Sequence, residues 1–246
     1  MKRIPAEKKI IQNVQIIDIA EEGKGVGKAE DLVLFIEKAV PGDVVDVELY
    51  RKKKNFAEAK IVNVIKPSEY RTEPFCPHFG VCGGCKWQHL TYEAQLKFKQ
   101  KSALDALERL GKVNTETAEP ILQSFETRYY RNKLEFTFSN KRWLTAEDMQ
   151  NRDDLQELDA LGFHIPQRFD KILNIETCYL QTDPSNEIRN QVREFAMQNG
   201  ISFYDLRQHE GALRNLIIRT STTGEVMVIV VFAYPTDNEI ESVMSS

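Results

Sequence analysis

Short apolar runs separated by turn signals in the first part of the chain predict a small β-barrel. Strand-like runs occur at residues 13–19, 32–36, 45–50 and 57–65. In the third of them Val45, Val47 and Leu49 alternate with polar residues, which is the period of a half-buried strand. Several short strands over about 60 residues are typical of a closed barrel of the OB type. We therefore predict a first domain over residues 1–67.

Beyond residue 67 the pattern becomes a mixture of helices and strands. Leu134, Phe136 and Phe138 alternate with polar residues and predict a strand with one buried face. Further strands are expected at 161–165, 215–220 and 226–233, and helices at 91–110, 184–199 and 237–244. The predicted fold class is therefore α+β, in which a mixed α/β domain over residues 68–246 follows the barrel.

The helix predicted over residues 91–110 has recognisable ends. Thr91 is suited to cap its first turn, and Gly111 follows its last. The apolar face expected to be buried consists of Leu96, Ala103, Leu107 and Leu110. The segment from about 144 to 160 carries six acids and one arginine, so we interpret it as an acidic insertion.

Composition and charge narrow the functional classes. Hydrophobic residues make up 41% of the 246 residues, which is ordinary for a globular protein, and no apolar run is long enough to span a membrane. The N-terminus lacks the apolar stretch of a secretory signal, so the expected location is cytoplasmic. Residues 1–143 carry 25 basic and 20 acidic side chains, whereas residues 144–246 carry 8 and 17. The basic excess of the first part is compatible with a polyanionic partner or with an ordinary solvated surface.

The cysteines carry the most specific pattern in the sequence. Three lie in a C-x5-C-x2-C loop and the fourth follows after a gap of 92 residues; they are Cys76, Cys82, Cys85 and Cys178. Gly83 and Gly84 permit tight turns there and leave amide N–H groups that can point at sulfur. A [4Fe–4S] cluster tolerates a remote fourth thiolate, whereas a zinc site usually pairs two short motifs. The spacing therefore favours a cluster over zinc, and both over a redox dithiol.

Two basic segments are candidates for nucleic-acid contacts. Arg51–Lys54 forms a basic turn between two predicted strands and includes Lys52 and Lys53. Tyr129 and Tyr130 precede Arg131, Asn132 and Lys133, and aromatic rings beside basic side chains can stack bases and hold phosphates. The competing interpretations are a solvated hairpin tip and a strand with a charged start.

These motifs together resemble the iron–sulfur RNA uracil-5-methyltransferases of the 23S ribosomal RNA type. The resemblance rests on an OB-like unit similar to a TRAM domain at about 8–67, on the cysteine pattern, on Tyr130–Lys133, and on Gly211-x-x-Arg214-Asn215. It implies a [4Fe–4S] cluster on Cys76, Cys82, Cys85 and Cys178. It also implies that Lys52, Lys53, Arg131, Asn132, Lys133 and Arg214 contact RNA. The implied partner is ribosomal RNA with a single-stranded or loop uridine, and neither DNA nor a membrane is expected.

The sequence departs from this family in its catalytic parts. In the family, a C-terminal Rossmann-like domain binds S-adenosylmethionine and supplies a cysteine that attacks C6 of uracil, so that C5 becomes methylated. This sequence has no fifth cysteine and no glycine-rich strand–turn–helix after residue 120. The resemblance therefore implies that the chain is an N-terminal portion without that domain, with no catalytic and no S-adenosylmethionine-binding residues, and inactive alone.

Two other functional classes compete with this interpretation. The chain could be a stand-alone RNA-binding module stabilised by zinc, or an iron–sulfur electron carrier. An electron carrier would leave the barrel and the basic segments without a role. Metal identity separates the first two classes, and the salt dependence of RNA binding separates both from the carrier.

Overall fold

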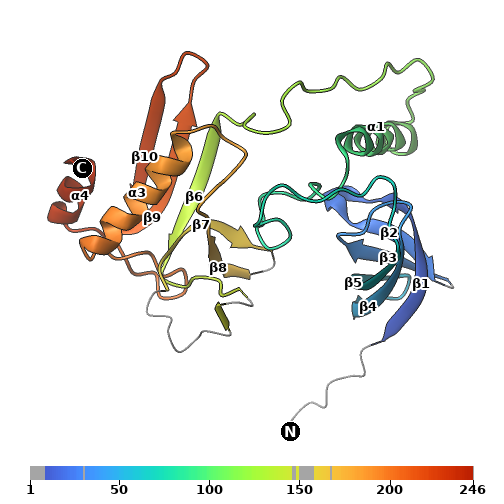
Figure 1. The fold of residues 1–246 in the computed structure, drawn as a ribbon, viewed down its shortest axis with the longest axis horizontal. Helices are drawn as coiled ribbons and strands as arrows, with labels where there is room; N and C mark the ends of the chain where they lie inside the picture. The colour runs from blue at the N-terminus through green and yellow to red at the C-terminus, as the bar shows by residue number, and fades with distance from the viewer. Residues whose placement is uncertain (1–8, 30, 146–147, 150–157, 167, 246) are drawn as a thin grey trace, which may run out of the picture. The chain divides into compact units, whose positions relative to one another are not determined.

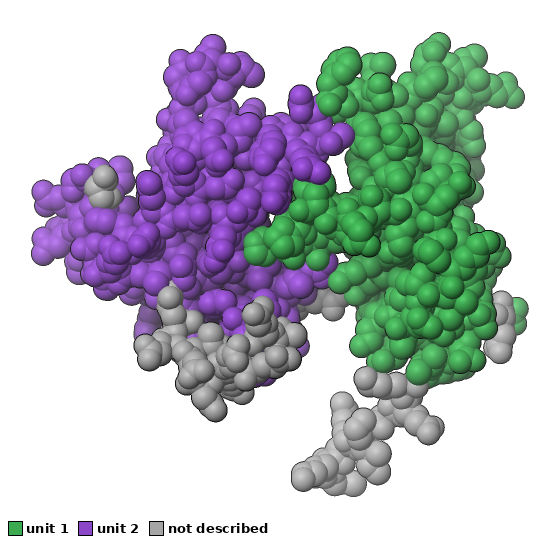
Figure 2. All heavy atoms as spheres, in the orientation of Figure 1, with its two compact units in different colours: residues 1–79, 85–125 green, residues 80–84, 126–246 purple. Residues whose placement is uncertain are grey.

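The structure is a computed structural model that describes residues 9–29, 31–145, 148–149, 158–166 and 168–245. It divides into two compact units (Figure 2). The first comprises residues 1–79 and 85–125, and the second comprises residues 80–84 and 126–246. The predicted acidic insertion falls mostly outside the described residues. No helix in the described part of the chain is long and apolar enough to cross a membrane.

The first unit contains a closed five-stranded barrel (Figure 1). Its strands are β1 (Ile10–Ile19), β2 (Gly25–Ala29), β3 (Leu32–Glu37), β4 (Val44–Lys52) and β5 (Phe56–Lys66), in the order β1-β2-β3-β5-β4. A short 3-10 helix, η1 (Glu21–Gly23), connects the first two strands. All neighbouring strands are antiparallel except β3 and β5, which pair in parallel from Val33–Phe56 to Glu37–Lys60. The predicted barrel is confirmed.

The barrel core follows from the alternation along its strands. Every second side chain points inward, so the small interior fills with aliphatic groups. The buried core residues are Val14, Ile16, Leu34, Ile36, Ala39, Val45, Val47, Ala57 and Ala59. Phe35 and Phe56 belong to the adjacent strands β3 and β5. The centres of their rings lie 5.7 Å apart in an edge-to-face arrangement.

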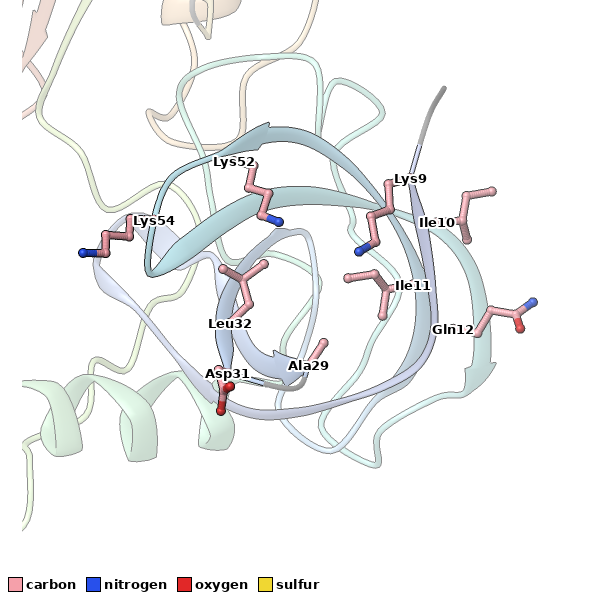
Figure 3. Close-up of a pocket in the computed structure, with 9 residues that line it drawn as sticks. All are labelled: Lys9, Ile10, Ile11, Gln12, Ala29, Asp31, Leu32, Lys52 and Lys54. Carbon is pink, nitrogen blue, oxygen red and sulfur yellow. The ribbon is translucent and has the colours of Figure 1, made fainter. Parts of the chain in front are cut away.

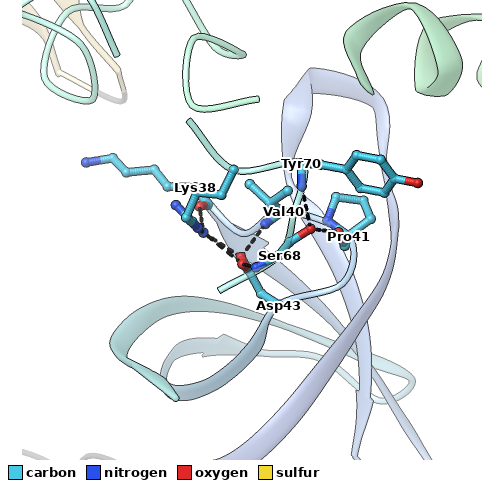
Figure 4. A network of polar contacts seen from close by, with 7 residues as sticks. Lys38, Val40, Pro41, Asp43, Ser68 and Tyr70 are labelled. Atoms are coloured by element: carbon cyan, nitrogen blue, oxygen red, sulfur yellow. Dashed lines mark hydrogen bonds and ion pairs between the residues drawn. The ribbon is translucent and has the colours of Figure 1, made fainter. Parts of the chain in front are cut away.

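A buried carboxylate ties the barrel to the segment that follows it (Figure 4). Asp43 is fully buried and accepts hydrogen bonds from the backbone N–H of Val40 at 2.8 Å and of Ser68 at 2.9 Å. The Arg71 guanidinium donates to both of its oxygens. Gly42 has a φ of +96°, and a Cβ there would lie 2.8 Å from the Ser68 hydroxyl oxygen, so only glycine fits this turn. The polar network therefore fixes residues 68–71 against one end of the barrel.

The helix α1 (Tyr92–Arg109) has the predicted start but a different buried face. The Thr91 hydroxyl accepts a hydrogen bond from the Ala94 N–H at 3.3 Å, which caps the first turn. The predicted apolar face is wrong, because Leu107 and Leu110 at the end of the helix are exposed. Ala94 and Phe98 are buried instead, in a cluster with Ile19, Val40 and Leu90.

The second unit is built on a five-stranded sheet. Its strands are β6 (Lys133–Ser139), β7 (Ala160–Ile165), β8 (Arg168–Asn174), β9 (Leu213–Thr220) and β10 (Val226–Phe232), in the order β10-β9-β6-β7-β8. The helices are α3 (Ser185–Gln198) and α4 (Asp237–Ser245). Leu134, Phe136 and Phe138 on β6 are buried, as the alternation predicted.

The sheet of this unit is antiparallel throughout, since every neighbouring pair of its strands runs in opposite directions. The order of elements along the chain does not fix the pairing. Helix α3 connects β8 at one edge to β9, which lies on the other side of β6 and runs antiparallel to it. The sequence pattern identified the elements but not the direction in which β9 enters the sheet.

Strand β10 lies at an edge of this sheet and is unusually exposed. Among the strands that the structure describes, it pairs only with β9, and all seven of its residues are apolar. Four of them, Val226, Met227, Val228 and Ile229, have exposed fractions of 37–57%.

Candidate nucleic-acid interface and cysteine loop

A cavity opens at one end of the barrel, where the start of β1, the β2–β3 turn and the β4–β5 hairpin meet (Figure 3). Its volume is about 730 Å³. It is lined by Lys9, Ile10, Ile11, Gln12, Ala29, Asp31, Leu32, Lys52 and Lys54. Three lysines and one aspartate give these walls a positive charge, and the remaining side chains are apolar apart from one glutamine.

The β4–β5 hairpin presents two of the predicted RNA contacts. Lys52 ends β4 and lines the cavity, whereas Lys53 forms the turn, where its N–H donates to the Phe56 carbonyl at 2.8 Å. Both side chains are exposed. Their neighbour Arg51 is engaged differently, because its guanidinium lies 3.2 Å from the Glu58 carboxylate. Glu58 also accepts from Lys24 at 2.9 Å, and these two cations hold the pKa of Glu58 below its usual value, Lys24 with the larger effect.

A second basic surface lies where β6 begins. The Arg131 N–H donates to the Leu180 carbonyl at 2.8 Å, and the Asn132 carbonyl accepts from the Thr220 N–H at 3.0 Å. These backbone bonds fix the chain while the side chains of Tyr130, Arg131, Asn132 and Lys133 remain exposed. The arrangement places an exposed aromatic ring next to basic groups in the second unit.

Sequence reasoning missed one member of this surface, Arg219. The register pairs Lys133 on β6 with Arg219 on β9, so the two cations are direct cross-strand neighbours. Like charges in such a pair destabilise a sheet unless an anion lies nearby. The alternation along β9 predicts that the side chain of Arg219 is exposed. It does not predict that β9 pairs with β6, and this pairing is what places Arg219 beside Lys133.

Arg214 lies elsewhere in the same unit. Lys133 pairs with residue 219 and Thr137 with Asn215, so Arg214 is at the opposite end of the β6–β9 pair. Its guanidinium lies 5.3 Å from the centre of the Tyr204 ring. The structure therefore brings Arg131, Asn132 and Lys133 together but separates Arg214 from them.

A salt-bridged carboxylate stabilises the turn that follows Tyr204. Asp205 is buried, and its carboxylate accepts from the Lys141 ammonium at 2.8 Å and from the Arg207 N–H at 2.8 Å. These donors hold the pKa of Asp205 far below its usual value, and the hydrogen bond from Lys141 is the largest cause. Asp170 similarly accepts from the Arg207 guanidinium at 2.6 Å.

The predicted metal ligands are distributed between the two units. Cys76 and Cys85 belong to the first unit, and Cys82 and Cys178 to the second. None of the four forms a disulfide. Among the residues that the structure describes, no three His, Cys, Asp or Glu side chains are arranged to hold a metal ion. The four-cysteine assignment stays a prediction.

The glycines of the cysteine loop fulfil only part of the expectation, because neither Gly83 nor Gly84 has a positive φ and only the Gly84 amide points at sulfur. The Gly84 N–H donates to the Cys82 sulfur at 3.3 Å. The Gly83 N–H donates to the His164 carbonyl at 3.2 Å, and a Cβ on Gly83 would lie 2.6 Å from that same oxygen. A larger residue at 83 would therefore displace the loop from the end of β7.

The remote cysteine is held by polar side chains of α3. The Cys178 N–H donates to Asn186 Oδ1 at 2.8 Å, and Asn186 Nδ2 donates to the Cys178 carbonyl at 3.3 Å. Arg189 is fully buried and donates to the same Oδ1 at 3.0 Å and to the Ile175 carbonyl at 2.8 Å. Burial lowers the pKa of Arg189 to about 10. The backbone around Cys178 is thus held by the Asn186 side chain, which is itself held by the buried Arg189.

Comparison with known proteins first defines the class of the barrel. Residues 8–62 match the TRAM domain family. This range covers the five strands that close the barrel apart from the last residues of β5.

Proteins with similar sequences match most of the chain, beyond the barrel alone. A protein of Bacteroides thetaiotaomicron named an uncharacterized RNA methyltransferase is 53% identical over 223 residues, which are 91% of this chain and 49% of that protein. A protein of Porphyromonas gingivalis with the same name is 51% identical over 89% of this chain and 48% of its own length. The chain spans about half the length of the curated relatives it matches. The predicted resemblance holds at this coarser level: the chain contains a TRAM-domain match and is similar, over most of its own length, to proteins named RNA methyltransferases.

A solved structure gives the same result for the fold. The tRNA (uracil-54, C5)-methyltransferase of Pyrococcus abyssi, in complex with S-adenosyl-L-homocysteine, aligns with a TM-score of 0.60 at 23% identity, over 93% of this chain and 48% of that one. The alignment extends over nearly all of both units, so the fold-class prediction, which defined the chain by a missing Rossmann-like domain, is corrected here. The expected inactivity receives no support from these comparisons.

Proposed function

We propose that this chain takes part in the S-adenosylmethionine-dependent methylation of uracil C5 in 23S ribosomal RNA, and that both units bind that RNA. The observation that carries the proposal is the basic surface at the start of β6. There Arg131, Lys133 and Arg219 lie beside the exposed ring of Tyr130 on a rigid backbone. Phosphates would neutralise the Lys133–Arg219 pair, and Tyr130 would stack on an unpaired base.

Salt-dependent RNA binding tests this role. We expect the double variant Arg131→Ala/Lys133→Ala to weaken binding to single-stranded RNA whatever the RNA sequence. The slope of log K against log salt should become less steep by about 1.4, because each lost phosphate contact removes about 0.7. Arg168→Ala is the matched control, because Arg168 is exposed on β8 at the far edge of the same sheet. An unchanged slope in the double variant would assign these residues to an ordinary solvated surface.

The ribosomal substrate has its own test. The full chain is titrated with fragments of 23S rRNA that contain loop uridines, and with tRNA and 16S rRNA fragments as competitors at one fixed salt concentration. We expect the 23S fragments to bind most tightly. Equal affinity for all three would leave RNA binding intact and contradict the choice of substrate.

We also propose that Cys76, Cys82, Cys85 and Cys178 hold a [4Fe–4S] cluster. The donor set fits, because four cysteines without disulfides match the ligand count, and the Gly84 amide already donates to the Cys82 sulfur. A bound cluster would supply iron–thiolate bonds that fix these segments of chain. Asn186 and Arg189 would orient the fourth ligand through its backbone.

Iron and acid-labile sulfide analysis after anaerobic purification tests the cluster. We expect about four of each per chain, with visible absorption that Cys178→Ser abolishes. Full metal content in that variant would show that Cys178 is not a ligand. Stoichiometric zinc without sulfide would contradict the cluster and favour a zinc-stabilised RNA-binding module.

A further inference from the structure

The cavity at the end of the barrel has a polar mouth and an apolar floor. Figure 3 shows the side chains of Lys9, which directly precedes β1, and of Lys52, at the end of β4, pointing inward above Ile11, Ala29 and Leu32. Ile11, Ala29 and Leu32 are partly buried and pack against the barrel core, so the floor is rigid. Lys54 points away from the hollow in the same view.

The charges at the mouth are not compensated in the way that other charges on the barrel are. Lys24 and Arg51 pair with Glu58, and Lys60 pairs with Glu48 at 3.6 Å. Neither Lys9 nor Lys52 forms an ion pair with a residue that the structure describes, and this includes the Asp31 carboxylate, which also lines the cavity. Two ammonium groups directed at one hollow repel each other, and an anion between them would relieve that repulsion.

The size and chemistry of the cavity indicate the kind of anion. Its volume of about 730 Å³ lies in the range of about 300–1,000 Å³ that is usual for small-molecule sites. That is far more space than a phosphate alone would need. The apolar floor formed by Ile11, Ala29 and Leu32 offers contact to a flat, weakly polar group, while the lysines hold the charged one. A nucleotide combines these two parts.

We propose that this cavity binds one unpaired nucleotide of a single-stranded RNA, with its phosphate between Lys9 and Lys52 and its base on Ile11, Ala29 and Leu32. This inference rests on the proposed RNA-binding function and adds to it a defined subsite in the TRAM barrel. RNA is the natural source of such a nucleotide because unpaired bases in loops can be splayed out into pockets. A free mononucleotide has the same chemistry and serves as the probe.

The first experiment titrates the full chain with uridine 5′-monophosphate and with uridine, followed by NMR or calorimetry. We expect the monophosphate to bind and uridine to bind about tenfold more weakly, since the two lysine contacts to phosphate account for at least one tenfold step. Lys9→Ala/Lys52→Ala should weaken the monophosphate about tenfold or more. Lys66→Ala is the matched control, because Lys66 is exposed at the end of β5 and does not line the cavity.

A second variant separates the cavity from general electrostatics. Ala29→Phe fills the floor without changing the charge, and we expect it to abolish binding of the monophosphate and to weaken binding of a short oligouridylate. Circular dichroism checks that Ala29→Phe folds. If it does not, Lys9→Glu takes its place, because Lys9 lies at the exposed start of the barrel.

The outcomes distinguish this inference from the function on which it rests. Suppose that the wild type binds the oligouridylate, and that Ala29→Phe and Lys9→Glu bind both the oligouridylate and the monophosphate with unchanged affinity. The cavity is then not a subsite, whereas the proposed RNA binding stands. If the wild type binds no RNA, the proposed function fails. If it binds the monophosphate but no RNA, the ligand is a free nucleotide and the RNA subsite is refuted.

Discussion

Replacement of Asp43 by alanine tests how far one buried carboxylate holds the first unit together. Asp43 is fully buried and accepts four hydrogen bonds, two from the backbone N–H groups of Val40 and Ser68 and two from the Arg71 guanidinium. Alanine would leave both backbone donors without an acceptor in a buried place. It would also leave the Arg71 charge, whose side chain is only 24% exposed, without its partner.

The magnitude follows from these contacts. A buried donor that loses its acceptor costs about 1–3 kcal/mol, and breaking a buried ion pair from one side costs about 3–5 kcal/mol. These costs overlap, and Arg71 can still reach water, so we expect a loss of about 4 kcal/mol in the free energy of unfolding. With a urea m-value of about 2 kcal/mol/M, the midpoint of unfolding should fall by about 2 M.

The fluorescence of Trp87 is a suitable assay. Trp87 packs against the cluster that contains Val40, next to Asp43 in the fold, and Trp143→Phe removes the signal of the second unit. Asp46→Ala is the matched control. The Asp46 carboxylate accepts one hydrogen bond from the Asn13 N–H in an exposed position, so we expect a cost below about 1 kcal/mol. If Asp43→Ala costs no more than Asp46→Ala, the buried network does not stabilise the barrel as argued.

Two further predictions concern the second unit, with Trp143 fluorescence as the signal in a Trp87→Phe background. Gly83→Ala should cost about 1–3 kcal/mol because its methyl group would contact the His164 carbonyl, whereas Gly84→Ala should be nearly neutral; equal costs would contradict the steric argument. Since the folded state lowers the pKa of Asp205, its stabilising contribution is complete above the unfolded pKa of about 3.9 and is lost as the pH falls further. Asp205→Asn should therefore flatten the decline of stability between about pH 5 and pH 2, and an unchanged decline would assign it to other carboxylates.

The sequence predicted those features that depend on local periodicity. The barrel strands, the buried face of β6 and the Thr91 cap all follow from alternation or from one capping side chain. The buried face of α1 did not, because it depends on where Ile19, Val40 and Leu90 lie in space. The apolar residues at the end of the helix looked like a core but have no partner layer in the described structure.

The candidate sites divide in the same way. Lys52 and Lys53 were found as a basic turn, and Arg131 and Lys133 as a basic strand start. Lys9 and Arg219 were missed, since each gains its role only through pairing with a distant segment. The cysteine spacing identifies candidate ligands, but spacing contains no information about which compact unit each residue joins.

The exposed edge strand β10 has a consequence for handling the protein in solution. Among the described residues, no strand pairs with the outer side of β10, and its seven residues contain no charge and no proline that would discourage pairing with another chain. We therefore expect any aggregation to increase with protein concentration and to involve pairing at residues 226–232. A single lysine at Val228, which is 40% exposed, should act as a gatekeeper that raises the usable concentration without disturbing the buried side chains of β6 and β9.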